Sequence, residues 1–220
     1  MPQELLDPDA LDKCAGEYQA SECLTPAIWK FGYYPNVDEW MPGDLVLIRN
    51  LNGNFTHRTI EFFQRYGGYK ETDSRWHHAA VYLGYSGDLC EADTSGVIHS
   101  SINRYVSGHH MIRVRRDVHL DETTRWWIAI RALTRLRQSY SYSTIVETGL
   151  LALSRFRYQL PLTRHGSASS MICSKLYADA YQTATLKMLS NSSSTEVTPA
   201  FLSSTNRLAD VPVTWRRLSQ

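Results

Sequence analysis

Cys173 lies where a loop of small residues runs into a helical pattern, and it is the first residue that suggests chemistry. Apolar residues recur at four-residue spacing over 172–180, which indicates the buried stripe of a helix that starts near the cysteine. One of the serines within 167–170 is expected to cap this helix. The positive end of the helix and its open N–H groups favour a thiolate over a thiol, so the position suits a nucleophile. The alternative is a small core cysteine, because free cysteine is among the most buried residue types.

A cysteine nucleophile needs a base within hydrogen-bond reach and a third group that orients this base. His77 and His78 open a predicted strand, in which neighbouring side chains point to opposite faces, so only one of the two can meet Cys173. Glu91 lies on the next predicted strand, across a tight turn. If the two strands pair as a hairpin, a carboxylate near residue 91 comes beside residue 78. The alternative for Glu91 is a solvated strand end or a partner for an arginine.

The elements that must position these residues are short strands and helices. Strands are predicted at 45–49, 77–84, 89–92, 96–99 and 111–115, and the tight turns between them favour an antiparallel meander. A closing edge strand is predicted at 211–215. Helices are predicted within 2–34, at 56–66, from 121 through 133, at 143–155 and from Cys173 onward. The serine-rich tract 190–195 is predicted to be a mobile loop.

Length and charge limit the functional class. A chain of 220 residues suffices for one domain, or for one domain with an appendage. The net charge of +1 argues against a nucleic-acid binder. Residues 1–45 carry nine acidic side chains against two lysines, whereas 104–137 is rich in arginine. We expect the arginines to form a solvated basic face or to dock the acidic N-terminal segment, and binding of an anionic polymer or phosphate is the weaker alternative.

Cysteine and histidine patterns argue against several other kinds of site. Four cysteines are too few for a disulfide scaffold, and we expect Cys14 and Cys23 to be unpaired, with a disulfide in an oxidising compartment as the alternative. Cys90 should face away from Glu91 and fill the core. The eight histidines form no spaced pair of the zinc-hydrolase kind, and the chain has no Gly-x-Ser-x-Gly turn or glycine-rich phosphate loop. We therefore expect neither a metal nor an organic cofactor.

The start of the sequence carries no targeting signal. Met1–Asp7 is acidic and lacks the basic start and apolar core of a secretory signal. No apolar run approaches membrane-spanning length, so we expect no stable membrane insertion. The chain is therefore expected to be made as a soluble protein in the cytoplasm, and action outside it requires a dedicated export machine.

Three stretches carry a resemblance to a known family. The first, Pro42–Val46, has the pattern of a turn and an opening strand. The second comprises His78–Gly84, with the pattern of a histidine strand, and Leu89–Ala92, with that of an acidic strand. The third comprises Ile172–Leu176, with the pattern of a cysteine helix, and Thr198–Ala200, with that of a Thr-Pro turn. Together they resemble the circularly permuted branch of the NlpC-type papain-like cysteine peptidases, which is related to the lecithin-retinol acyltransferase fold. The order His, Glu, Cys is that of the permuted branch. The resemblance covers about residues 40–208.

The resemblance implies roles for three residues. Cys173 would be the nucleophile, His78 the base and then the acid, and Glu91 the orienting group, with His77 as the rival base. It implies an α+β, papain-like fold with a central antiparallel sheet packed against helices. We expect this permuted catalytic domain over 40–220, a helical and loop extension over 1–39, and a helical insertion around 121–164.

The function that the resemblance implies is that of a cysteine peptidase or amidase cleaving a peptide amide of bacterial peptidoglycan, with no cofactor. Together with the missing signal, this suggests an antibacterial effector toxin that a specialised secretion system carries into the periplasm of a target cell. An immunity protein and a component of the secretion machine are the expected partners. Two alternatives stay open: a lipid or protein acyltransferase or thioesterase with a long apolar groove beside Cys173, and a catalytically inactive binding module.

Overall fold

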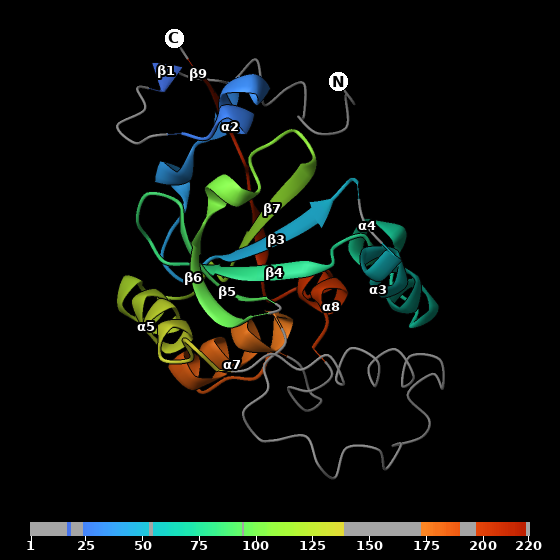
Figure 1. Ribbon diagram of the computed structural model, residues 1–220. Helices are drawn as coiled ribbons and strands as arrows, with labels where there is room; N and C mark the ends of the chain where they lie inside the picture. The colour runs from blue at the N-terminus through green and yellow to red at the C-terminus, as the bar shows by residue number, and fades with distance from the viewer. Residues whose placement is uncertain are drawn as a thin grey trace.

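A six-stranded antiparallel sheet lies at the centre of the computed structural model, in the order β6-β5-β4-β3-β7-β8 (Figure 1). The structure describes residues 17–18, 24–52, 55–93, 95–138, 173–189 and 197–218. The strands of this sheet are β3 (Leu45–Asn50), β4 (His78–Tyr82), β5 (Asp88–Asp93), β6 (Gly96–Ser101), β7 (His110–Arg116) and β8 (Ala209–Val211). Helices pack against the sheet, which confirms the predicted α+β class with a central antiparallel sheet.

The strand order differs from the expected meander at one step. β4, β5 and β6 follow one another across the sheet, but β7 pairs with β3 instead of with β6. The chain between β6 and β7 buries Ile102 and Val106 in the same cluster as side chains of β3 and β4, so it crosses one face of the sheet before β7 begins. The expectation of a simple meander was therefore wrong here, because the periodicity within a strand does not specify its neighbour.

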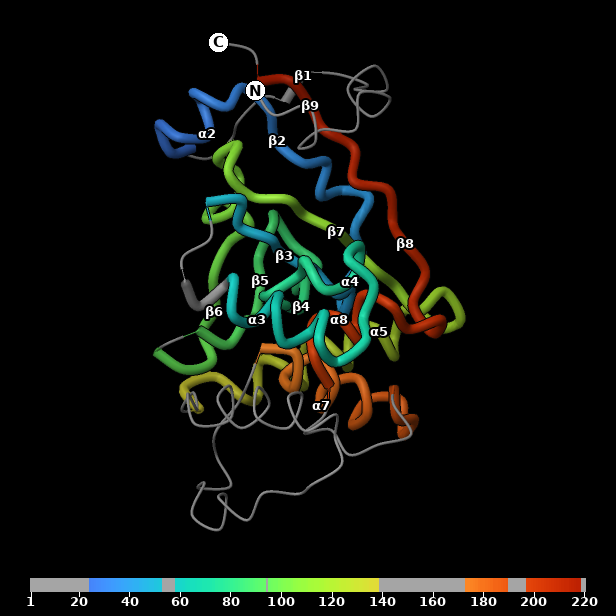
Figure 2. The backbone as a smooth tube through the Cα atoms, turned by 90° about the vertical axis from the view of Figure 1, so that its right-hand side faces the viewer, coloured from blue at the N-terminus to red at the C-terminus, as the bar shows by residue number. Residues whose placement is uncertain are grey.

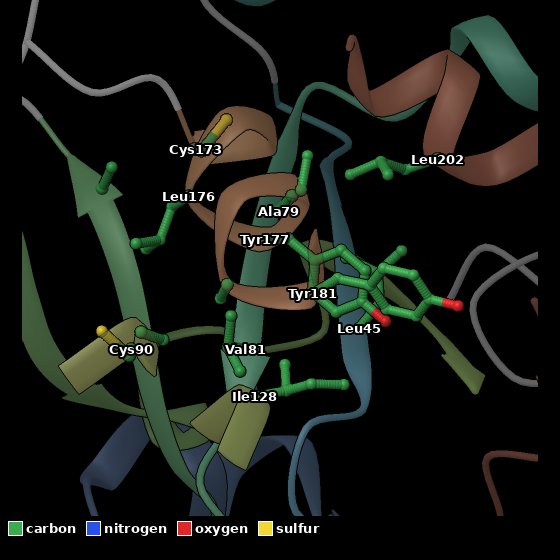
Figure 3. Packing of buried hydrophobic residues seen from close by; sticks show 14 of the residues in the cluster. Leu45, Ala79, Val81, Cys90, Ile128, Cys173, Leu176, Tyr177, Tyr181 and Leu202 are labelled. Atoms are coloured by element: carbon green, nitrogen blue, oxygen red, sulfur yellow. The ribbon is translucent and has the colours of Figure 1, made fainter. Parts of the chain in front are cut away.

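Both faces of the sheet are buried, because alternate side chains of its central strands enter two different hydrophobic clusters. On the first face, Val81 and Cys90 pack against α5 (Glu122–Leu133) and α7 (Cys173–Thr185) (Figure 3). On the second face, Ala80 belongs to a cluster shared with the N-terminal segment. Figures 1 and 2 show the resulting three layers, with α5 and α7 on one side of the sheet and α2 on the other.

A second, small sheet joins the two ends of the described chain. Its strand order is β1-β9-β2. The strands are β1 (Glu17–Tyr18), β2 (Tyr33–Pro35) and β9 (Trp215–Leu218), with α2 (Pro26–Phe31) before β2. Trp215 of β9 packs edge-on against Phe31 of α2, with 5.7 Å between the ring centroids. The C-terminal strand therefore holds the N-terminal segment against the body of the protein.

The single closing strand expected at 211–215 was wrong. β8 ends at Val211 and β9 begins at Trp215, and the two strands belong to different sheets. Pro212 lies between them and has no N–H to donate to a strand ladder. The segment consequently supplies the edge strand of the central sheet at one end and the middle strand of the small sheet at the other.

Three further helices lie beside the central sheet: α3 (Phe55–Tyr66), α4 (Glu71–Ser74) and α8 (Pro199–Ser204). The helix expected at 56–66 is confirmed as α3. The buried amide of Gln64 donates to the carbonyl oxygen of Trp76 (2.8 Å) and accepts the backbone N–H of Ala200 (2.8 Å). This side chain joins α3 and α8 to the segment that leads into β4.

Arginines of β7 are tied into the fold. Arg116 binds the fully buried carboxylate of Asp44 at 2.7 Å, which ties β7 to the turn before β3. Arg113 pairs with Asp210 at 2.8 Å, and Arg115 is buried and donates to carbonyl oxygens at the end of α8. These three guanidinium groups are engaged in the fold, which leaves little support for an open anion site there.

The division at residues 39 and 40 and the insertion at 121–164 stay predictions. The described part of the N-terminal segment shares a cluster with the central sheet, as Ile28 does, and α5 contributes Ile128 to the main core. The predicted helix 143–155, the serines of 167–170, the tract 190–195, Cys14 and Cys23 lie outside the described residues. Within the described ranges, no helix is both long and apolar enough to cross a membrane.

Candidate active site

His78 and Glu91 lie on paired strands of the central sheet. His78 is the first residue of β4, and Glu91 belongs to β5. Ala80 lies directly opposite Glu91, so His78 and Glu91 are diagonal neighbours on one face. His78 Nε2 lies 2.6 Å from Glu91 Oε2. The expectation that a carboxylate near residue 91 comes beside residue 78 is confirmed.

Cys173 comes from a different layer, as the first residue of α7. Leu176 packs the first turns of this helix into the main core, and Figure 3 shows Cys173 at the helix start. The hydroxyl of Ser174 donates to the carbonyl oxygen of Val197 at 2.6 Å, which fixes that start. Cys173 is buried, with 5% of its surface exposed, and hydrogen bonding and charge at its side chain are among the causes that raise the pKa of His78.

One imidazole thus joins a thiol and a carboxylate that come from separate elements. A histidine ring has two nitrogens, and Nε2 of His78 faces Glu91, so Nδ1 is the nitrogen that can serve Cys173. The three residues suggested by the sequence, Cys173, His78 and Glu91, therefore lie together in the fold. A thiol, an imidazole and a carboxylate are the three kinds of group that cysteine catalysis uses.

The electrostatics of the cluster favour an ionised pair. Burial lowers the pKa of His78, but its hydrogen bonds and charge interactions with Cys173 and Glu91 outweigh burial and raise the pKa to about 10. Burial raises the pKa of Glu91, yet the hydrogen bond with His78 and the charge of its ring lower that pKa to about 2. At neutral pH the imidazole therefore carries a proton beside an ionised carboxylate.

His77, the rival base, has a different partner. Its Nε2 accepts the backbone N–H of Asn50 at 2.8 Å, and the side chain is buried. Asn50 ends β3, so this hydrogen bond joins the segment before β4 to the neighbouring strand. His78, and not His77, is the histidine that meets Cys173.

Two further side chains at the site were not named from the sequence, although an arginine partner was the alternative considered for Glu91, and Arg104 is such a partner. Arg104 ends the short helix η2 (Ile102–Arg104), and Tyr105 follows it. Both bind the carboxylate of Glu91. Their distance from Glu91 in sequence gives no indication of this contact. The loop after β6 crosses the sheet face and brings both side chains to the Glu91 carboxylate.

Cys90 has the position expected for a core residue. Its side chain is fully buried on the first face of the sheet, among residues that pack against α7. Burial raises the pKa of this thiol to about 12, and the neighbouring charge of Glu91 is a second, smaller cause of the rise. A thiol in this state is a poor nucleophile, so Cys90 is a matched reference for Cys173.

Neither a family model nor a curated protein matches this chain. Among solved structures, the chain is similar to the metalloprotein YiiX from Escherichia coli O157:H7. The two chains are 14% identical, with a TM-score of 0.44, and the match covers 80% of this chain and 99% of the other. Because the likeness is distant, the roles of Cys173, His78 and Glu91 depend on their own geometry.

The chemistry available at this site is acyl transfer to a thiol. Within the described part of the chain, no group of three or more histidine, cysteine, aspartate or glutamate side chains is arranged to hold a metal ion. The N–H groups in the first turn of a helix lack partners within that helix, so the start of α7 can stabilise an oxyanion beside Cys173.

Proposed function

We propose that the protein is a cysteine hydrolase that cleaves an amide bond, with Cys173 as the nucleophile, His78 as the acid and base, and Glu91 as the orienting group. The observation that supports this most is the placement of one imidazole between a thiol at a helix start and a fully buried carboxylate. Structural ion pairs also occur in proteins, but they do not require a thiol at the positive end of a helix.

The reaction follows from the three positions. The Cys173 thiolate attacks the amide carbonyl carbon, an S–C bond forms, and the N–H groups at the start of α7 stabilise the oxyanion. His78 gives its proton to the leaving nitrogen as the C–N bond breaks, which leaves an acyl group on sulfur. His78 then takes a proton from water, whose oxygen attacks the thioester. The acid leaves and the thiolate and imidazolium return.

The substrate we infer is a peptide amide of bacterial peptidoglycan. This inference rests on the resemblance of the three sequence stretches to permuted NlpC-type peptidases, and the site geometry itself is neutral between amide substrates. Export by a specialised secretion system, action in the periplasm of a target cell and an immunity protein as partner belong to the same proposal.

Digestion of purified peptidoglycan, followed by mass spectrometry of the muropeptides, tests both levels of this proposal. We expect wild-type protein to produce new amine and carboxyl termini, Cys173→Ala to produce none, and Cys90→Ala to resemble wild type. Intact muropeptides after wild-type treatment would contradict the peptidoglycan substrate. If the wild-type protein also shows no Cys173-dependent hydrolysis of p-nitrophenyl acetate, the proposed hydrolase activity is contradicted and an inactive binding module is favoured.

A further inference from the structure

The two oxygens of the Glu91 carboxylate have different partners. Arg104 Nη1 lies 2.9 Å from Oε1. The hydroxyl of Tyr105 donates to Oε2, the same oxygen that faces His78 Nε2. Glu91 therefore binds three side chains from two segments, β4 and the turn at Arg104 and Tyr105, and only His78 belongs to the acyl-transfer chemistry derived above.

Arg104 and Tyr105 are presented by a turn that is anchored on both sides. Ile102 before them is fully buried, and Val106 after them is 1% exposed. The ring of Tyr105 also lies over the site, with its centroid 6.1 Å from that of His78. The turn is thus held by apolar packing, while its two polar side chains point to the carboxylate.

Because Glu91 is buried, its ionised carboxylate depends on these donors for stabilisation. The side chain is fully buried, and an ionised carboxylate removed from water is costly unless donors replace the water. An ionised carboxylate only accepts hydrogen bonds, so each donor favours that form over the protonated one. Burial, followed by the charge of Glu91, raises the pKa of Tyr105 well above its ordinary value, so its hydroxyl stays protonated and donates.

We propose that Tyr105 and Arg104 are positioning residues, which hold the Glu91 carboxylate ionised and aimed at His78. Their role in catalysis rests on the proposed function, because they act on the reaction only through Glu91 and His78. Without them, Glu91 would take up a proton at higher pH and the imidazolium would lose its fixed partner. Three titratable or charged groups bind Glu91: His78 (β4), Arg104 (η2) and Tyr105 (after η2). Cys173 (α7) lies beyond His78, Asp93 of the same strand lies beyond Arg104, and Cys90 lies on the opposite face of that strand.

The first test follows the His78–Glu91 hydrogen bond itself, by NMR of the Nε2–H proton in full-length protein labelled at histidine nitrogen. We expect this signal in wild type down to strongly acidic pH, because the pKa of Glu91 is about 2. In Tyr105→Phe and in Arg104→Gln, the pH below which the signal disappears should rise by about one unit, because one donor to the carboxylate is lost. Arg104→Lys, which keeps the charge, should restore most of the wild-type behaviour.

Tyr34→Phe is the matched control. The hydroxyl of Tyr34 donates to Asn103 Oδ1 at 2.7 Å, so this variant removes a hydrogen bond from the same turn without touching Glu91. It should titrate as wild type does. If it shifts the signal as much as Tyr105→Phe does, the turn is a general brace and the positioning role is contradicted. The same conclusion follows if Tyr105→Phe and Arg104→Gln both titrate like wild type.

The second test links the two residues to chemistry with p-nitrophenyl acetate as the probe. The acetyl group passes to Cys173 sulfur with release of p-nitrophenolate, and water activated by His78 then releases acetate. Tyr105→Phe should slow the steady-state rate about tenfold with little change in KM, the size expected for one charge-assisted hydrogen bond. A wild-type protein without Cys173-dependent turnover contradicts the proposed function, whereas turnover that is unchanged in Tyr105→Phe and Arg104→Gln contradicts only the positioning role.

Discussion

His77 and His78 are neighbours in sequence but bind different partners, Asn50 in one case and the Cys173–Glu91 pair in the other. His77→Gln should therefore lower the free energy of unfolding by about 1–2 kcal/mol, since a hydrogen bond at a buried position is disturbed. The rate of Cys173 alkylation by iodoacetamide should stay within about twofold of wild type. Urea unfolding and labelling kinetics measure the two effects, and a large loss of Cys173 reactivity in this variant would show that His77 belongs to the site.

Glu91 should make the stability of the protein depend on pH in acid solution. Its pKa is about 2 in the folded protein against an ordinary value of 4.5, so the unfolded chain binds the proton more tightly. The stabilisation is complete above pH 4.5 and is lost as the pH falls toward 2. Between about pH 5 and pH 3 this contribution falls by about 2 kcal/mol.

Urea unfolding at several pH values measures this loss in wild type and in Glu91→Gln, which cannot titrate at this position. The slope of stability against pH should be smaller in the variant over that window. Equal slopes would mean that Glu91 is not held ionised in the fold.

The sequence suggested much of the site, because Glu91 and His78 lie on strands joined by a tight turn and hairpin pairing brings such residues together. The resemblance already favoured His78 over His77, and the fold places His78 beside Glu91, whereas the register that makes the two diagonal neighbours came only from the fold. Arg104 and Tyr105 could not be predicted, since their contact with Glu91 depends on the path of the loop across the sheet.

At the level of elements, the turn before β3 approaches α5 closely at Gly43. The backbone there has φ +79°, and a Cβ atom would lie 2.6 Å from the carbonyl oxygen of Arg125 in α5. Gly68 has a similar φ of +96°, but a Cβ atom there would meet nothing within 4 Å. Gly43→Ala should therefore lose about 1–3 kcal/mol more free energy of unfolding than Gly68→Ala. An alanine at either position has a strained backbone, but only the alanine at position 43 also has a Cβ atom too close to its neighbours.

Chemical denaturation of the two variants measures this difference. Equal losses would show that α5 does not press on the turn. A shift of α5 should also affect α7, because the two helices pack against each other and α7 carries Cys173.

Elements with a strong internal pattern were predicted more successfully than their arrangement. α3, α5 and the strands from β3 to β7 follow from periodicity and turn residues. The pairing of β7 with β3 and the division of 211–215 between two sheets depend on contacts distant in sequence, and a single strand pattern carries no information about them.

At the level of the whole molecule, β9 connects the C-terminal segment with α2 and β2. Trp215 is 6% exposed and packs against Phe31, so Trp215→Ala should lower the free energy of unfolding by about 3–5 kcal/mol. Arg217→Ala, on an exposed side chain of the same strand, should change it by less than about 0.5 kcal/mol. Urea unfolding measures both, and a small effect of Trp215→Ala would show that β9 does not hold the N-terminal segment in place.

The most direct test of the account is the labelling of wild type and His78→Gln with limiting iodoacetamide near pH 6, with the modified cysteines mapped by mass spectrometry. We expect Cys173 to react well before Cys14 and Cys23, because the proposed mechanism uses its sulfur as a nucleophile paired with His78, and His78→Gln should slow this reaction about tenfold or more. Labelling of Cys173 no faster than that of Cys14 and Cys23, or a rate unchanged in His78→Gln, would contradict a nucleophile activated by His78.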